Sequence, residues 1–426
     1  MFVRVELAYG KNGLEVELPA EGTTVLEPSY LPGVPCEEEA LRQAFRSPMG
    51  TLPLRELAQS GQTVAISVCD ITRPMPSSRV LPVLLAELEH VPRDRVTILV
   101  ATGTHRSNTV EELEGMLGAE VVRNYPVVNH QSFRPETLSY RGALPSGIPV
   151  WLNSTWLESD VRITTGFVEP HFFAGFSGGP KLVAPGLAGF DTIMELHSAP
   201  LIAHPRATWG ITRGNPIHDA IREVAALSRV DFSLDVTLNR DHEITSVHAG
   251  ELFQAHGSAC RFAKQTAMQP VARPFDVVVT TNSGYPLDLN LYQSVKGMSA
   301  AARIVRRGGA IVCAAECSDG IPEHGEYRRL LASTADPASF LDTIRRENVT
   351  THDQWQVQIQ SQIQLKARVL LKSDGLTPRQ IRSAHLEPVR DLETTVLELL
   401  DEAGPDARLG VLPQGPQTIP YLSPPA

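Results

Sequence analysis

The most informative stretch of the sequence covers residues 160–200 and reads DVRITTGFVEPHFFAGFSGGPKLVAPGLAGFDTIMELHSAP. It begins with an apolar run of strand type, continues as a glycine-rich loop and closes on a helical pattern from Asp191. Because glycine lacks a Cβ atom and reaches positive φ, such a loop lets backbone N–H groups approach a ligand, and donors near a helix start suit a phosphate. The pattern alone is a weak signal for a ligand-binding loop. Its glycines are Gly175, Gly178, Gly179, Gly186 and Gly189.

Three side chains in this stretch, His171, Lys181 and His197, strengthen the signal. A single histidine is more often structural than functional, and a single lysine is usually exposed to solvent. Here the three flank one loop whose apolar neighbours predict partial burial, and burial favours a neutral, nucleophilic lysine amine. These neighbours are Phe172, Phe173, Phe176, Leu182 and Val183.

The length and charge of the chain limit its class. A chain of 426 residues is too long for one ordinary core and predicts two or three domains. The formal net charge of -10 and the pI near 5.7 argue against a nucleic acid or an anionic membrane as partner. The first residues read as a strand rather than a signal peptide, and no apolar run reaches membrane-spanning length, so the cytoplasm is the expected compartment.

The cysteines do not suggest a disulfide framework, because the 5 of them are odd in number and scattered over a long chain. Cys313 and Cys317 lie in an apolar run and are expected to be structural thiols. The sequence contains no HExxH motif, CxxC pair or EF-hand loop. A metal, if bound, is therefore not expected in a familiar cage made only of protein ligands.

The residues before the glycine-rich stretch alternate between strands and helices. The apolar runs TVAISVCD and VTILVA are each followed by a polar loop and a helical pattern. Such alternation predicts a parallel sheet, in which ligands gather beyond the carboxyl ends of the strands. Asp70, Arg73 and His105 fall at these ends, although ordinary turn chemistry would explain each of them alone.

A fresh strand, helix and strand pattern follows the linker-like run PVARP, which predicts a domain boundary at residues 269–274. We therefore expect two α/β domains with mostly parallel sheets, covering residues 1–268 and, in a smaller domain, 274–407. The proline-rich tail, residues 408–426, is a candidate to return to the first domain. One face of the first helix in the second domain carries three polar residues, which alone indicate a solvated surface: Tyr292, Gln293 and Lys296.

Six pieces of sequence form a combination that is specific as a set, although each is weak alone. They are Asp70-Ile-Thr-Arg-Pro-Met-Pro, Ala101-Thr-Gly-Thr-His-Arg, Glu169-Pro-His-Phe-Phe-Ala-Gly-Phe-Ser-Gly-Gly-Pro-Lys-Leu, His197, Tyr292-Gln-Ser-Val-Lys-Gly and Trp355. They extend in this order over most of the chain, which resembles the lactate racemase family. Members of that family use a nickel-pincer nucleotide, and no position that carries the family's chemistry departs from its pattern here.

The resemblance implies a role for each matching residue. Lys181 is similar to the lysine that holds the cofactor covalently, a pyridinium-3-thioamide-5-thiocarboxylic acid mononucleotide, and His197 to the protein ligand of its nickel ion. His105 and His171 resemble an acid/base pair on opposite faces of the substrate. The other matching positions are Asp70 and Thr72 on the cofactor side, and Arg73, Tyr292, Gln293, Lys296 and Trp355 on the substrate side.

The implied activity is racemisation or epimerisation at C2 of a small 2-hydroxy acid. Removal of the C2 proton is difficult because the neighbouring carboxylate is already negative, whereas hydride transfer to a pyridinium-nickel centre gives a planar keto acid. The hydroxyl proton must leave and return in each cycle, which calls for a histidine on each side. The active site is expected in a cleft between the two domains. Cofactor-biosynthesis proteins are the expected partners for loading.

Two functions of other classes are alternatives. A zinc-dependent hydrolase would use His171, His197 and His204, but no compact ligand signature supports it. A cofactor carrier without catalytic activity would need Lys181 and His197 but no acid/base pair. Within the racemase class, lactate or another short aliphatic acid is expected ahead of malate. Two cations are candidates for a second substrate carboxylate, with a surface salt bridge as the more ordinary role of each: Arg106 and Arg206.

Overall fold

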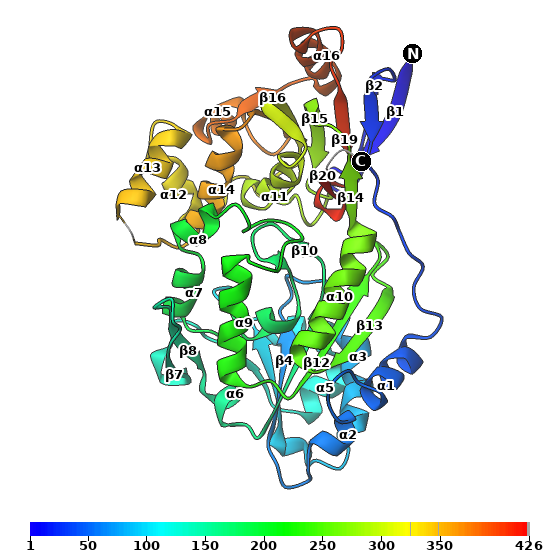
Figure 1. Ribbon diagram of the computed structural model, residues 1–426, viewed down its shortest axis with the longest axis vertical. Coiled ribbons are helices and arrows are strands. Elements are labelled where there is room, and N and C mark those ends of the chain that lie inside the picture. Colours follow the sequence, from blue (N-terminus) through cyan, green and yellow to red (C-terminus); the bar gives the residue numbers. More distant parts are fainter. Residues whose placement is uncertain (324, 348, 424–426) are drawn as a thin grey trace. The chain divides into compact units, whose positions relative to one another are not determined.

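The computed structural model describes residues 1–323, 325–347 and 349–423 and has the predicted α/β fold with mostly parallel sheets (Figure 1). The chain forms two compact units, each with its own six-stranded sheet. Unit 2 consists of Tyr30–His197 and His204–Thr266. Unit 1 consists of Met1–Ser29, Ser198–Ala203 and the chain from Ala267 on, so the polypeptide passes between the units more than once.

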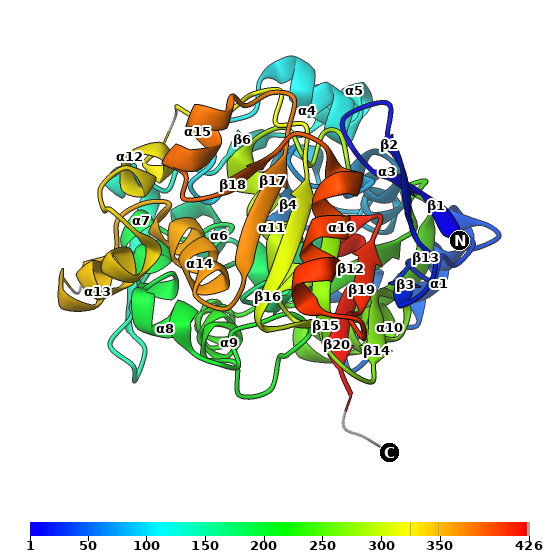
Figure 2. The same ribbon diagram turned by 90° about the horizontal axis from the view of Figure 1, so that it is seen from above.

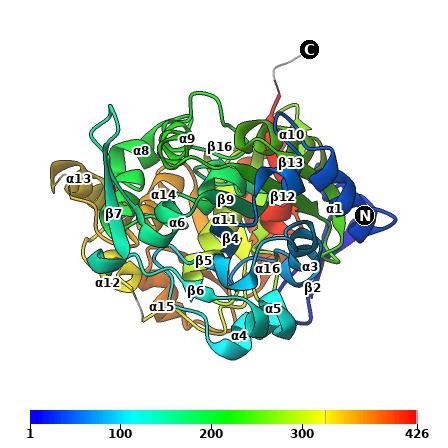
Figure 3. The same ribbon diagram turned by 90° about the horizontal axis from the view of Figure 1, so that it is seen from below.

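The sheet of unit 2 has the strand order β13-β12-β9-β4-β5-β6 (Figure 3). Neighbouring strands are parallel except at one edge, where β13 runs antiparallel to β12. The strands are β4 (Val64–Cys69), β5 (Val96–Ala101), β6 (Val127–Asn129), β9 (Val161–Phe167), β12 (Phe232–Leu238) and β13 (Ile244–Gly250). The continuous apolar run of β4 follows from its burial along its whole length, since a strand covered on both faces needs apolar residues on both.

The two faces of this sheet differ in chemistry because successive side chains of a strand point to opposite sides. On one face Ile66, Ile163 and Leu234 are fully buried in a large apolar core, to which α1 and α3 contribute Leu41 and Leu81. The opposite face is polar in the middle of the sheet although it is equally buried. Its polar residues are Ser67, Thr164, Ser233 and Asp235.

The helices of unit 2 include the helical patterns expected after β4 and β5. Helix α4 starts with the capping box formed by Thr109 and Glu112, which satisfies two backbone donors that would otherwise lack a partner. The helices are α1 (Glu37–Arg46), α2 (Leu54–Leu57), α3 (Ser77–Glu87), α4 (Val110–Leu117), α5 (Ala119–Asn124), α6 (Ser154–Glu158), α7 (Phe190–Leu196), α9 (Pro216–Ser228) and α10 (Leu252–Ala267), the last ending at the unit boundary. The antiparallel pair β7 (Leu138–Ala143) and β8 (Pro149–Asn153) completes the unit.

The sheet of unit 1 has the order β18-β17-β16-β15-β19-β3, with every neighbouring pair parallel (Figure 2). Its strands are β3 (Thr23–Val25), β15 (Phe275–Thr281), β16 (Val305–Ala314), β17 (Arg368–Lys372), β18 (Glu387–Val389) and β19 (Leu409–Leu412). Its helices are α8 (Ala199–Ala203), α11 (Leu291–Ala301), α12 (Tyr327–Leu331), α13 (Pro337–Glu347), α14 (Gln354–Gln364), α15 (Pro378–Ser383) and α16 (Leu392–Ala403). The first residues form the predicted strand as part of a hairpin of β1 (Phe2–Leu7) and β2 (Leu14–Pro19), which buries Leu7 and Leu18 in the core of this unit.

The composition of the two units differs from the predicted domains at both ends of the chain. Residues 1–29 lie in unit 1 rather than with the N-terminal half, because β3 extends the second sheet by pairing with β19. The C-terminal tail does not return to the first domain, since β19 pairs with β15 and β20 (Ile419–Leu422) with β14 (Met268–Val271). The expected linker is therefore partly a strand.

Among the residues described, no helix is both long and apolar enough to span a membrane. The cysteines carry free thiols, and Cys313 and Cys317 are completely buried. This burial agrees with their expected role as structural thiols in an apolar strand and its following loop.

Candidate active site

The glycine-rich stretch folds into a small hairpin followed by a tight turn. Strands β10 (Pro170–His171) and β11 (Gly175–Phe176) form the hairpin, and the 3-10 turn η3 (Gly179–Leu182) follows it. Gly178 precedes this turn with a φ of 75°, a left-handed conformation that glycine adopts without strain. His171 thus lies in the hairpin and Lys181 in the turn, while His197 directly follows α7.

Phe173 lies at the centre of the three side chains that the sequence singled out. Its buried ring meets the His171 ring edge-on with centroids 4.5 Å apart and the His197 ring edge-on at 5.3 Å. The Lys181 amine lies 5.8 Å from the centre of the same ring. The fold therefore brings together two histidines and a lysine that are separated by up to 26 positions in the sequence.

His197 is held in one tautomer. It is buried at the end of α7, and its Nδ1 lies 2.7 Å from the carbonyl oxygen of Ile193. Because a carbonyl can only accept, Nδ1 carries a proton, and the lone pair of the neutral ring is on Nε2. A backbone partner of this kind fixes both the tautomer and the orientation of histidines that ligate metals.

His171 has the opposite arrangement. Its Nδ1 accepts a hydrogen bond of 3.2 Å from the backbone N–H of Ala174 and a weaker contact of 3.5 Å from that of Phe173. The proton of the neutral ring is therefore on Nε2. His171 and His197 thus lie beside the same ring but differ in which nitrogen carries the proton.

Lys181 is partly buried, as its apolar neighbours predicted. Its backbone N–H donates to Gly178 O at 3.0 Å, and its carbonyl accepts from Gly186 N at 3.1 Å. Gly186 O in turn accepts from Gly103 N at 3.0 Å, in the loop that follows β5. These bonds join the turn that carries Lys181 to the loop that carries His105.

Asp70 and His105 form a hydrogen-bonded pair at the carboxyl ends of adjacent strands β4 and β5. His105 Nδ1 donates to Asp70 Oδ2 at 2.7 Å, and Thr72 Oγ1 donates to Asp70 Oδ1, also at 2.7 Å. Burial alone would raise the pKa of Asp70, but its hydrogen bond to His105 and the charge of Arg73 outweigh burial and lower it. Asp70 is therefore a buried carboxylate that holds a proton on His105 Nδ1 and leaves the lone pair on Nε2.

Arg73 belongs to the same network, because its Nη1 donates to the Thr72 hydroxyl at 3.0 Å. These contacts confirm the prediction that Asp70, Arg73 and His105 gather beyond two parallel strands, and Thr72 lies with them.

In unit 1 the predicted substrate residues are also connected with one another. Lys296 Nζ donates to Gln293 Oε1 at 2.9 Å on the exposed side of α11, and Trp355 Nε1 donates to the Tyr292 hydroxyl at 3.2 Å from α14. Asn290 caps the helix through its side chain, which accepts from Gln293 N. The four residues thus form two hydrogen-bonded pairs at the start of α11.

Three other residues proposed from sequence are bound to neighbouring groups. Arg106 forms two hydrogen bonds to the Glu112 carboxylate at 2.8 and 2.6 Å, and Arg206 Nε donates to Arg213 O at 3.2 Å. His204 Nδ1 accepts from Arg206 N at 3.2 Å. Within the described part of the chain, no group of three or more His, Cys, Asp or Glu side chains is arranged to hold a metal ion.

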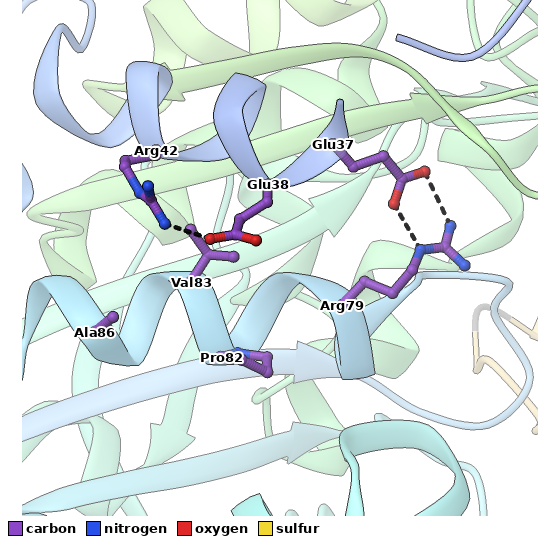
Figure 4. A pocket seen from close by; sticks show the side chains of 7 residues that line it. All are labelled: Glu37, Glu38, Arg42, Arg79, Pro82, Val83 and Ala86. Carbon is purple, nitrogen blue, oxygen red and sulfur yellow. Dashed lines mark hydrogen bonds and ion pairs between the residues drawn. The ribbon is translucent and has the colours of Figure 1, made fainter. Parts of the chain in front are cut away.

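A cavity of about 480 Å³ lies elsewhere in unit 2, between α1 and α3 (Figure 4). None of the predicted site residues lines it, and its charged groups bind one another: Arg79 to Glu37 at 2.7 and 3.3 Å, and Arg42 to Glu38. Its remaining lining residues are Pro82, Val83 and Ala86. The chemistry of the sequence motifs, not the size of this cavity, identifies the candidate active site.

Comparison with known proteins decides the family. Residues 9–210 match the lactate racemase N-terminal domain, and residues 271–419 match the lactate racemase C-terminal domain. A lactate racemase of Thermoanaerobacterium thermosaccharolyticum is 36% identical over 422 residues, which are 97% of this chain and 98% of the relative. The chain belongs to the lactate racemase family. A lactate racemase of Lactiplantibacillus plantarum is likewise 36% identical, over 419 residues, 97% of this chain and 98% of the relative.

Solved structures agree with membership of the lactate racemase family. The lactate racemase apoprotein of T. thermosaccharolyticum matches with a TM-score of 0.92 and 34% identity, covering 98% of this chain and 100% of that one. A Thermotoga maritima protein matches with a TM-score of 0.69 over 92% of this chain and 100% of that one, but its 20% identity supports the fold alone. As a member of this family the protein is an isomerase of the racemase class.

Sequence reasoning missed a set of buried polar residues close to the Lys181 turn. Asp235 and His256 are completely or almost completely buried, and both bond to the backbone of the glycine-rich stretch. Asp235 left a signal that could have been noticed, because a carboxylate in the middle of the apolar strand FSLDVTL is unusual. No comparable sequence signal marked His256, since it lies on α10 among ordinary helix residues.

Proposed function

We propose that this protein inverts C2 of a small 2-hydroxy acid, lactate or another short aliphatic acid, with a nickel-pincer nucleotide on Lys181. His105 and His171 act as the acid/base pair. The observation that carries the proposal is the arrangement of His171, Lys181 and His197 around the ring of Phe173. The names of the two curated relatives, both lactate racemases, support the choice of substrate.

The chemistry of these side chains suits the proposed cofactor. Lys181 offers a primary amine at a partly buried turn, where a covalent thioamide link can form. His197, whose Nδ1 donates to Ile193 O, offers its Nε2 lone pair, the form in which imidazole ligates nickel. When bound, the nucleotide supplies the acceptor and donor of the hydride. The protein needs to contribute only one metal ligand in this scheme.

His105 is the side chain best prepared to remove the substrate hydroxyl proton. Asp70 holds the proton of the neutral ring on Nδ1, so Nε2 is the basic nitrogen. When Nε2 takes a proton, the buried Asp70 carboxylate stabilises the resulting imidazolium. This division of roles between a histidine and a buried carboxylate is common in general base catalysis.

His171 acts on the opposite face of the substrate. Its neutral ring presents Nε2–H, which can donate to the substrate oxygen, because Nδ1 accepts from backbone amides. To act as an acid, the ring first takes a second proton on Nδ1 and loses those contacts, which are weak at 3.2 and 3.5 Å. The imidazolium then gives its Nε2 proton to the substrate oxygen and becomes a neutral ring with its proton on Nδ1. In the reverse direction Nε2 of that neutral ring accepts the hydroxyl proton of the substrate.

The resemblance gives two cations and an amide the role of binding the substrate carboxylate. Arg73 can form a bidentate pair with a carboxylate, while Lys296 adds a point charge and Gln293 a hydrogen-bond donor. Both arginines suggested for a second carboxylate have other partners, Arg106 the Glu112 side chain and Arg206 the Arg213 carbonyl. These pairings favour a short aliphatic substrate over malate.

A zinc-dependent hydrolase receives less support. Such an enzyme needs three protein ligands and an open position, and the described side chains include no group of three or more suitable ligands. A cofactor carrier would not need the Asp70–His105 pair, and burying the Asp70 carboxylate costs free energy. The racemase explains both features.

The deciding experiment uses full-length protein produced together with the cofactor-biosynthesis proteins. Mass spectrometry of the digested protein should find the nucleotide on the peptide that contains Lys181. A chiral assay with single enantiomers of lactate, other short 2-hydroxy acids and malate should show inversion, fastest for the short aliphatic acids. No inversion of any acid would reject the function, whereas malate turnover with little lactate turnover would overturn only the ranking of substrates.

A further inference from the structure

The turn that carries Lys181 rests on the polar face of the unit 2 sheet. Asp235 on β12 accepts a hydrogen bond of 2.8 Å from Gly179 N, at the start of the turn. Ser67 on β4 donates to the carbonyl oxygen of Leu182 at 2.8 Å, at the end of the turn. Both side chains are completely buried, so the turn is attached to the sheet at each end without access to water.

The hairpin that precedes the turn is attached to helices in the same way. His256 on α10 donates from Nε2 to Ser177 O at 2.9 Å, and His218 on α9 donates from Nδ1 to Ala174 O at 3.2 Å. Asn215, which caps α9, donates to Phe173 O at 2.8 Å. Burial lowers the pKa of His256 to about 4 and that of His218 to about 3, so both rings are neutral donors near pH 7.

The glycines of the stretch make room for two of these side chains. A Cβ atom on Gly178 or Gly166 would lie 2.7 Å from Asp235 Oδ1, and one on Gly179 would lie 2.5 Å from His256 Cγ. A Cβ atom essentially never comes this close to a neighbouring heavy atom, so a side chain at any of the three positions would force Asp235 or His256 to shift. Asp235 and His256 therefore need glycine in the stretch as well as backbone partners in it.

Asp235 occupies a position that is unfavourable for stability alone. Its Oδ2 is buried and has no partner of good hydrogen-bond geometry among the described residues, although the Ser233 hydroxyl interacts with the carboxyl group. A buried polar group with half of its hydrogen bonds missing costs free energy, and an apolar residue of similar size would avoid that cost. One physical reason to retain such a residue is that it orients the backbone segment to which it is hydrogen-bonded.

We propose that Asp235 and His256 are positioning residues that hold the Ser177–Gly179 backbone and, through it, direct the Lys181 amine toward the site of nucleotide attachment. The inference rests on the proposed function, because that function makes Lys181 the attachment point. Neither residue touches the reacting atoms in this scheme. Each acts on Lys181 through two or four residues of the main chain.

The test compares pairs of variants in the full-length chain, produced with the cofactor-biosynthesis proteins. Asp235→Asn keeps an oxygen for Gly179 N and His256→Gln keeps a donor for Ser177 O, whereas Asp235→Leu and His256→Leu remove the polar atom. The first readout is the fraction of the Lys181 peptide that carries the nucleotide. The second is the rate of amide hydrogen exchange over residues 172–183 in protein without cofactor.

We expect each leucine variant to lower the loaded fraction by about 10-fold or more and to speed exchange in this segment by a similar factor, since the bond removed protects it. The asparagine and glutamine variants should stay within about 2-fold of the wild type in both readouts. Thr164→Val removes a buried hydroxyl from the same face of the sheet without touching the turn, and it should change neither readout.

A control separates positioning from stability. Leu117→Ala creates a cavity at a completely buried position of α4 and destabilises the same unit far from the turn in sequence. If Leu117→Ala lowers the loaded fraction as much as the leucine variants do, the role of Asp235 and His256 is structural and the proposal is overturned. Should a leucine variant fail to fold, Asp235→Ser and His256→Asn withdraw the same bonds with shorter polar side chains.

The remaining outcomes are also decisive. Leucine variants that load and exchange like the wild type would overturn this inference alone. An active wild-type protein without nucleotide on Lys181 would overturn the proposed function, and the inference would fall with it.

Discussion

The two loops that carry the proposed acid/base histidines are held in place by different means. His105 lies on a loop where its side chain is 46% exposed, and the hydrogen bond that it donates to the buried Asp70 carboxylate orients it. His171 lies in a hairpin whose backbone is bound from beneath by buried polar side chains and whose glycines fit closely against them. The orientation of His105 therefore depends on a charged side chain, whereas the position of the His171 hairpin depends on close packing against glycines and on hydrogen bonds to its backbone.

This difference predicts whether a substitution in each loop should affect mainly the rate or mainly the stability. A change in the Asp70–His105 pair removes an electrostatic interaction without opening the core, so it should lower the rate more than the stability. A substitution in the side chains that bind the hairpin backbone alters buried packing, so it should lower the stability of unit 2. It should affect the rate of turnover only through that loss of stability. Four experiments test this difference between the two loops, and the experiment with the largest expected effect comes first.

Asp70→Asn should lower kcat by about 10²- to 10⁴-fold, because a neutral amide neither fixes the required tautomer of His105 nor stabilises its imidazolium. Initial rates in the chiral assay, divided by the loaded fraction, measure the effect. Thr72→Val, which removes only the hydroxyl bound to Asp70 Oδ1, is the matched control and should lose less than about 10-fold. A rate for Asp70→Asn within 2-fold of wild type, roughly the assay error, would contradict the role of the charge.

Gly178→Ala should lower the free energy of unfolding by about 2 to 5 kcal/mol, since it combines a strained φ with a steric clash. The φ is 75°, and the new Cβ would meet Val168 Cγ2 at 2.6 Å and Asp235 Oδ1 at 2.7 Å. Gly118→Ala is the matched control in the same unit, with a φ of 92° and no atom within 4 Å, and should cost only about 1 to 2 kcal/mol. Urea denaturation measures both. Equal costs would show that the space beneath the hairpin is not tightly filled.

Asp235→Asn should remove a pH dependence of stability. Burial raises the pKa of Asp235 to about 7 from an ordinary value of 3.8, so between these values the folded protein binds more protons than the unfolded chain. The contribution of Asp235 to the free energy of unfolding therefore falls as pH rises from about 4 to about 7, by about 1.4 kcal/mol for each pKa unit at most. The asparagine variant should lack this fall.

The buried histidines make it necessary to measure the difference between the two proteins rather than the wild type alone. His256 and His218 have lowered pKa values, so their contributions rise with pH over part of the same range. Their effects are common to wild type and variant and cancel in the difference curve. The neighbouring thiols of Cys69 and Cys260 have raised pKa values and titrate above this range. A difference curve that is flat from pH 4 to 7 would mean that Asp235 is charged in the folded protein.

Arg106→Ala should have the smallest effect. Arg106 is 67% exposed and paired with Glu112 on the surface, where such pairs contribute little and are screened by salt. Thermal unfolding and turnover of lactate and malate should both stay at wild-type values. A selective loss of malate turnover would instead give Arg106 a place at a second substrate carboxylate.

Much of the fold was predictable from local pattern. Continuous apolar runs predicted β4 and β5, and the helical patterns after their polar loops predicted α3 and α4. The alternation of strands and helices predicted parallel sheets, because a parallel connection needs a crossover helix. The motifs also predicted which polar residues gather beyond the strands, since the carboxyl ends of parallel strands share one edge.

Local sequence patterns determined the α/β class and the first strands of unit 2, and the motifs carried the resemblance to the lactate racemase family. The roles of the matching residues stay predictions. Only the tertiary structure decided that residues 1–29 and the tail join unit 1, and that Phe173 gathers His171, Lys181 and His197. It also decided that Asp235 and His256 hold the hairpin and the turn. The physical reason is the range of the interactions. Helix caps and strand alternation involve neighbours in sequence, whereas the pairing of an edge strand and the partner of a buried side chain depend on residues that are close only after folding.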